Sequence, residues 1–84
     1  MRTNGYHESD CVRLVRDVSG EDPYGNGEIQ SVSAGQIGTV IVGSPGRSEF
    51  DVEFMVPRSD NGWKNFVLIV QAEDLEPYKE SATV

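Results

Sequence analysis

The clearest pattern in the chain is the alternation of apolar and polar residues in EFDVEFMV, between positions 49 and 56. The apolar residues fall at every second place, namely Phe50, Val52, Phe54 and Val56. The places between them hold Asp51, Glu53 and Met55. A period of two is typical of a β-strand with one buried and one solvated face. The preceding run IGTVIV, residues 37–42, is rich in β-branched residues and predicts a second strand.

Two short segments predict the turns that join neighbouring strands. In Ser44-Pro45-Gly46-Arg47, proline suits the second position of a type II turn and glycine the third, where φ is positive. Asn61-Gly62 tolerates the left-handed angles that a tight hairpin demands. The hairpin leads into NFVLIVQ, residues 65–71, whose nearly continuous apolar run predicts a strand buried on both faces.

The remaining elements are shorter. The segment DCVRLVRD, residues 10–17, predicts a first strand with Val12 and Leu14 facing inward. Residues 72–75 predict one helical turn that places Leu75 in the core. A brief last strand follows near residues 76–78, and Pro77 restricts it to a sheet edge.

The other segments have no period that predicts a strand. Residues 18–35 contain four glycines and one proline and predict a long loop. The polar ends, residues 1–9 and 79–84, predict a disordered N-terminal tail and a frayed C-terminal tail.

These elements predict a single all-β domain over residues 10–78. About five short strands without an amphipathic helix favour a small closed barrel, because closure hides the strand edges. The 84 residues leave too little interior for a second domain. One cysteine and no cysteine–histidine cluster argue against a disulfide and a structural zinc site. We predict no cofactor. No apolar run resembles a signal peptide or a membrane span, so we expect a cytoplasmic protein.

The order of these segments resembles that of an uncharacterised bacterial family of small stand-alone SH3-like domains. The family runs D-x-V-x-L, G-x-x-G-T-V, Y-x-V-E-F and L-P-x-x-x-L-x-P, and the likeness covers residues 10–78. The matching residues are Asp10, Val12, Leu14, Gly35, Gly38, Thr39, Val40, Phe50, Val52, Glu53, Phe54, Leu75 and Pro77. The G-x-x-G-T-V piece is also similar to segments of KOW-type domains, of the small SH3-like barrel protein of photosystem I and of the nitrile hydratase β-subunit. The resemblance implies an SH3-like barrel of about five strands with a short 3-10 turn before the last strand. It implies no activity.

Net charge narrows the classes of partner. Fourteen acidic side chains against seven basic ones give a formal net charge of −7. An acidic surface repels phosphate backbones, which argues against direct binding to nucleic acid. The same charge steers basic proteins toward the domain. It also keeps a small domain soluble without any role in recognition.

Candidate catalytic residues lack the neighbours that catalysis requires. His7 lies in the predicted tail, where nothing would hold it within hydrogen-bond reach of a nucleophile. Cys11 begins a strand, where a partly buried filler is a simpler interpretation than a thiol activated by Arg13. We therefore predict that the protein is not an enzyme.

Carboxylates suggest metal sites only loosely. Asp51 and Glu53 share one strand face, near Glu49, and such a face is usually just solvated. In GEDPYGNGE the oxygens of Asp22, Asn26 and Glu28 lack the full signature of a calcium loop. We therefore predict no metal site.

Aromatic residues in the long loop and at the second hairpin point to recognition. Tyrosine and tryptophan supply rigid contact area and are enriched among the residues that dominate interface affinity. The candidate partner-binding residues are Tyr24, Asn26, Arg58, Asp60, Trp63 and Lys64. We predict a monomer or weak homodimer that binds another protein through the long loop and the 57–65 hairpin. Two alternatives remain: an acidic inhibitor that imitates a phosphate backbone, and an accessory component of an electron-transfer complex.

Overall fold

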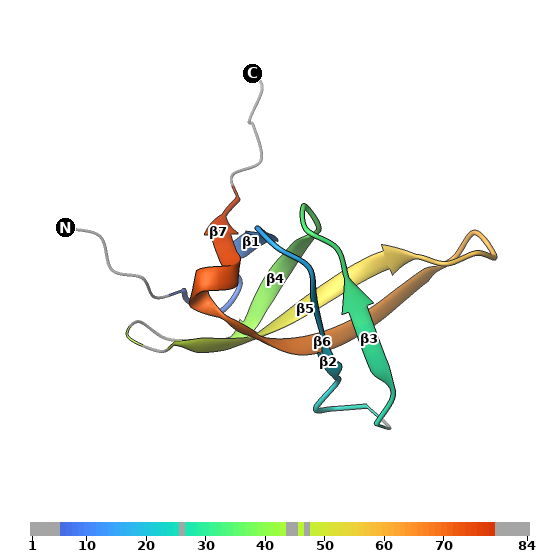
Figure 1. The fold of residues 1–84 in the computed structure, drawn as a ribbon, viewed down its shortest axis with the longest axis horizontal. Helices are drawn as coiled ribbons and strands as arrows, with labels where there is room; N and C mark the ends of the chain where they lie inside the picture. Colours follow the sequence, from blue (N-terminus) through green and yellow to red (C-terminus); the bar gives the residue numbers. More distant parts are fainter. Residues whose placement is uncertain (1–5, 26, 44–45, 47, 79–84) are drawn as a thin grey trace, which may run out of the picture.

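The residues that the structure describes form seven β-strands and one short 3-10 turn (Figure 1). The computed structural model describes residues 6–25, 27–43, 46 and 48–78. The strands are β1 (Cys11–Leu14), β2 (Val18–Glu21), β3 (Ile29–Val32), β4 (Ile37–Val42), β5 (Glu49–Pro57), β6 (Trp63–Gln71) and β7 (Leu75–Pro77). The 3-10 turn η1 (Ala72–Asp74) joins β6 to β7. The predicted all-β fold, with a 3-10 turn before the last strand, is confirmed.

The five predicted strands form one antiparallel sheet in the order β6-β5-β4-β1-β7. Strand β7 lies at an edge of this sheet, as Pro77 predicted. The β5–β6 ladder is the longest, running from the pair Glu49–Gln71 to the pair Pro57–Trp63. Figure 1 shows these two strands as a long ribbon that projects from the rest of the domain.

The core confirms the period of two in β5. Phe50, Val52 and Phe54 are fully buried, with exposed fractions of 0%. The other buried apolar residues around them are Val12, Leu14, Val32, Val40, Phe66, Leu68, Val70 and Leu75. The prediction that β6 is buried on both faces is wrong at Ile69, whose exposed fraction is 53%. On the same outward face Val67 is buried, with an exposed fraction of 8%, so burial on both faces holds at Val67 and fails at Ile69.

Residues 18–35, which were predicted to be a loop, contain the antiparallel hairpin of β2 and β3. Only half of its less exposed positions carry apolar side chains. In β2 these positions are Val18 and Gly20, and in β3 they are Gln30 and Val32. A glycine and a glutamine at such positions remove the apolar alternation by which a strand is recognised.

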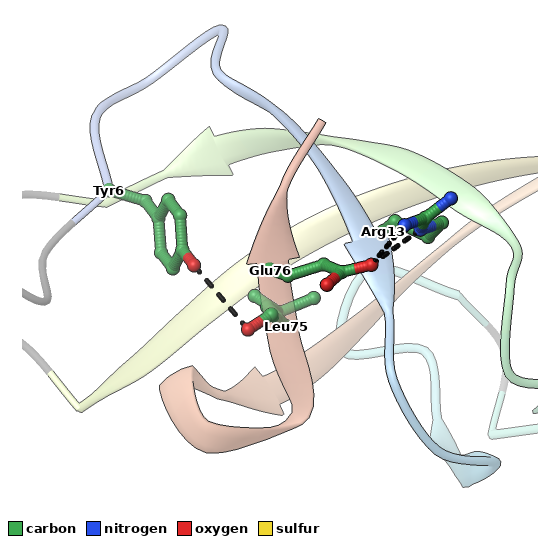
Figure 2. A network of polar contacts seen from close by, with 4 residues as sticks. All are labelled: Tyr6, Arg13, Leu75 and Glu76. Atoms are coloured by element: carbon green, nitrogen blue, oxygen red, sulfur yellow. Dashed lines mark hydrogen bonds and ion pairs between the residues drawn. The ribbon is translucent and has the colours of Figure 1, made fainter. Parts of the chain in front are cut away.

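The N-terminal residues that the structure describes pack against the domain. The rings of Tyr6 and Phe50 meet edge to face, with centroids 5.3 Å apart. The Tyr6 hydroxyl donates to the carbonyl of Leu75 at 3.5 Å (Figure 2). The prediction of a disordered tail is therefore wrong for residues 6–9, while residues 1–5 and the predicted tail 79–84 lie outside the described residues.

Strand β7 is fastened to β1 by a side-chain pair as well as by the ladder. Arg13 Nε donates to Glu76 Oε2 at 2.6 Å (Figure 2). Both side chains are partly exposed, so the pair adds at most about 1 kcal/mol to the free energy of unfolding. The ladder and core packing therefore hold β7 in place.

Each predicted corner contains a residue with a positive φ. Gly46 has a φ of 91°, as the third position of a type II turn requires, while residues 44, 45 and 47 lie outside the described residues. At the other corner Asn61 has a φ of 70°, and its N–H donates to the Arg58 carbonyl at 3.3 Å.

The part of the chain that the structure describes has no helix of sufficient length and apolarity to cross a membrane.

Candidate binding surface

The side chains of β5 and β6 that point away from the core form a continuous outer strip. This face is opposite to the inward side chains of Phe50, Val52, Phe54, Phe66 and Leu68, and the outer strip takes four residues of each strand, ending before the pair Glu49–Gln71. The ladder pairs them as Asp51–Ile69, Glu53–Val67, Met55–Asn65 and Pro57–Trp63. Pro57 is six positions after Asp51, which corresponds to about 20 Å along a strand. This outer strip is the candidate binding surface.

The β2–β3 hairpin curls around the free edge of β6 to reach the outer strip. Gly20 lies on the core side, where an added Cβ would be 3.8 Å from Leu68. Two residues later Asp22 lies at the edge, and its Oδ2 accepts from the Val67 N–H at 3.1 Å. The Oδ1 of the same carboxylate accepts from the Tyr24 N–H at 2.8 Å. The Asp22 carboxylate therefore holds the hairpin against the edge of β6 and orients the backbone at Tyr24.

Tyr24 extends across β6 to its partner on β5. Its hydroxyl donates to Asp51 Oδ2 at 2.5 Å, while the side chain remains 64% exposed. The pKa of Tyr24 is raised above its ordinary value of 10.0, first by this hydrogen bond and then by loss of hydration and the negative charges of Asp51 and Asp22. The ring of Tyr24 is thus held at one end of the outer strip with most of its surface open to solvent.

Trp63 marks the opposite end of the outer strip. It pairs with Pro57 across the ladder and has an exposed fraction of 62%. Beside it, Arg58 forms an ion pair with Asp60 at 2.9 Å, within the turn. Lys64 points to the other face, with its Nζ 6.0 Å from the centre of the Phe66 ring.

The structure divides the predicted partner-binding residues into two groups. Arg58, Asp60, Trp63 and Lys64 share the β5–β6 hairpin end, whereas Tyr24 lies at the far end of the outer strip. Figure 1 shows the tips of the β2–β3 and β5–β6 hairpins pointing in different directions. Asn26 lies outside the described residues. Tyr24 and Trp63 therefore bound one surface without touching each other.

The alternation of β5 places Met55 on the solvated face, but Ile69 and Val42 were not recognised from the sequence as exposed. Ile69 is 53% exposed and Met55 51% exposed, both on the outer strip, and Val42 of β4 is 41% exposed. Val42 aligns with Asp51, after a bulge that follows Val40. Ile69 could have been recognised by extending the phase of Phe66, Leu68 and Val70. The exposed side of Val42 could not, because the bulge changes the alternation of β4.

The other candidate residues and the hollow in the surface lie outside the outer strip. His7 and Cys11 are exposed, and the described residues contain no group of three or more histidine, cysteine or acidic side chains that could hold a metal ion. A shallow hollow of about 290 Å³ lies at the base of the β2–β3 hairpin. Its lining is Asp17, Val18, Ser19, Ser31, Val32 and Ser33.

Comparison of the chain with protein-family models, curated proteins and solved structures finds no match.

Proposed function

We propose that the protein is a non-enzymatic SH3-like module that binds another protein through the outer strip. The observation that carries the proposal is the placement of Tyr24 and Trp63, each more than half exposed, at the two ends of one sheet face. Large rigid aromatic side chains gain much on burial and lose little conformational entropy. Ile69 and Met55 supply further apolar surface between them.

The shape of the surface favours a macromolecular partner. The outer strip is a sheet face about 20 Å long on which Val67 is the one buried residue, whereas small-molecule sites are concave and enclose most of their ligand. The hollow beside β2 and β3 is open and lies at the base of that hairpin, apart from both aromatic ends of the strip. A protein surface that covers the whole strip would bury both aromatic residues at once.

A second candidate is an acidic inhibitor of a nucleic-acid enzyme. It is favoured by Glu49, Asp51 and Glu53, which occupy alternate positions on the outward face of β5. Regularly spaced carboxylates imitate the charge of a phosphate backbone, and such binding weakens steeply as salt rises. An aromatic contact changes little under the same conditions. Affinity at about 0.05 M and about 0.5 M salt therefore separates the two candidates.

The proposal is tested with the full chain as bait in extracts of its source cells. The retained protein is purified and titrated against the wild type, Trp63→Ala and Ile29→Ser. Ile29 is 65% exposed on β3, away from the outer strip, and provides the control. Trp63 is the chain's single tryptophan, so its fluorescence reports binding directly in the wild type. We expect Trp63→Ala to weaken binding at least about tenfold and Ile29→Ser to leave it unchanged. Equal binding by all three proteins would contradict the proposal.

A further inference from the structure

The chemistry of the outer strip indicates which kind of protein segment it accepts. We propose that the occupant is a basic amphipathic α-helix of another protein, lying along β5 and β6 with its apolar side on Ile69, Met55 and Trp63. This inference rests on the proposed function and names the partner class for the same surface. Three properties of the strip carry it: its exposed apolar surface, its charge and the pairing of its backbone within the sheet.

The exposed apolar surface supplies the contact. Ile69, Met55 and Trp63 are each more than half exposed, and all three lie on the outer strip. Val42 extends this surface onto β4 beside Asp51. A sheet face with apolar side chains is commonly covered by a helix that turns its own apolar side toward it. The strip is therefore the open side of a helix-on-sheet arrangement.

The charge of the strip selects a basic helix. Asp51 and Glu53 lie on it, Glu49 follows in the same phase, and no residue of the strip is basic. Among the described residues, Asp51 accepts from Tyr24, Glu49 accepts from Gln71, and Glu53 has neither a hydrogen bond nor an ion pair from its side chain. The three arginines that the structure describes pair with Glu76, Asp74 and Asp60. Cations for these carboxylates would therefore come from the partner.

The backbone of the strip favours a helix over an extended peptide. The β5 backbone pairs with β6 from Glu49 to Pro57 and with β4 from Asp51 to Phe54, and the Val67 N–H at the β6 edge donates to Asp22. An extended peptide laid on this face would leave its own amides and carbonyls without partners. A helix satisfies its backbone internally and presents only side chains. At 1.5 Å per residue, a strip of about 20 Å matches a helix of about 13 residues.

The test uses two synthetic helical peptides of about 14 residues that contain no tryptophan. Both carry leucines along one side, and the opposite side carries lysines in one peptide and glutamates in the other. Trp63 fluorescence and the anisotropy of a labelled peptide give the affinity for the full chain. We expect the lysine peptide to bind at least about tenfold more tightly than the glutamate peptide.

Matched variants locate the binding. Ile69→Ser and Glu53→Gln lie on the strip, and Ile29→Ser and Glu73→Gln are controls at exposed positions outside it. Each strip variant should weaken binding of the lysine peptide at least about threefold, and each control should leave it within about twofold. Circular dichroism confirms that every variant keeps its β structure. Because the comparison of the two peptides uses the wild type, it does not depend on any variant folding.

Several outcomes would overturn the inference. They are equal affinity for both peptides, no binding of the lysine peptide, or binding that is insensitive to Ile69→Ser and Glu53→Gln. Concentration-dependent self-association in sedimentation, abolished by Ile69→Ser, would identify a second copy of the chain as the occupant instead. A purified partner that binds the strip through an extended or acidic segment would overturn the helix inference and leave the proposed function standing.

Discussion

At the scale of single residues, Asp22 and Tyr24 determine how the β2–β3 hairpin meets the sheet. One carboxylate accepts from two backbone amides, those of Tyr24 and Val67, which lie 43 positions apart. The tyrosine hydroxyl then continues the connection to Asp51 on β5. The sequence predicts Tyr24 as a recognition residue, but its contact with Asp51 depends on a hairpin that the sequence does not reveal.

The contact with Asp51 raises the pKa of the Tyr24 phenol, which a titration can measure. Because the phenol donates to a carboxylate, its pKa lies above the ordinary value of 10.0. The raised pKa means that this contact stabilises the folded state fully below about pH 10, and that its contribution is lost as pH rises through the folded-state pKa. Ultraviolet difference titration of the wild type against Tyr24→Phe isolates this phenol. We expect Asp51→Asn to lower its pKa toward 10, and an unchanged pKa would show that the contact does not form.

At Gly38 the packing of the core leaves no room for a side chain. An added Cβ would lie 2.7 Å from Val52 Cγ1 and 2.8 Å from Phe54 Cδ1, both in the fully buried centre of the core. We expect Gly38→Ala to lower the free energy of unfolding by about 1–3 kcal/mol. Gly20→Ala is the matched control, because its Cβ would meet Leu68 at an ordinary 3.8 Å. Urea unfolding measures both, and equal effects would argue against the tight contact at Gly38.

At the scale of elements, the accuracy of sequence-based prediction follows the chemistry of the inward positions. Strands β4 and β5 were located almost to the residue, because β5 alternates without exception and β4 is rich in β-branched residues. Strands β2 and β3 were missed because Gly20 and Gln30 occupy two of their four less exposed positions. The hairpin is a strand pair because it packs on β6, where tertiary contacts outweigh its weak local preference.

The docking of this hairpin can be tested through the exchange of backbone amides. In Asp22→Ala the Val67 N–H loses its acceptor at an otherwise unpaired strand edge. We expect its hydrogen exchange to accelerate at least about tenfold, together with that of Tyr24. Glu21→Ala, one position earlier and exposed, is the control and should leave both amides unchanged. Protection at Val67 that survives the loss of Asp22 would show that another group covers this edge.

At the scale of the whole molecule, the described arginines do not pair with the acidic residues of the outer strip. Arg13, Arg16 and Arg58 are each paired with a carboxylate, while Asp51 and Glu53 on the outer strip face no cation among the described residues. The sequence predicts the acidic character and both aromatic residues. It does not predict that they share one face, because that requires the register of β5 against β6 and the path of the hairpin around the β6 edge.

The most direct test of the outer strip as the recognition surface is an amide chemical-shift map of the labelled chain on addition of the lysine peptide. We expect the largest shifts at Tyr24, Glu53, Trp63 and Ile69, which span both ends of the strip. Strands β1 and β7, at the other side of the sheet, should remain unchanged. Shifts concentrated at β1 and β7, with Trp63 and Ile69 unaffected, would contradict the assignment of recognition to the outer strip.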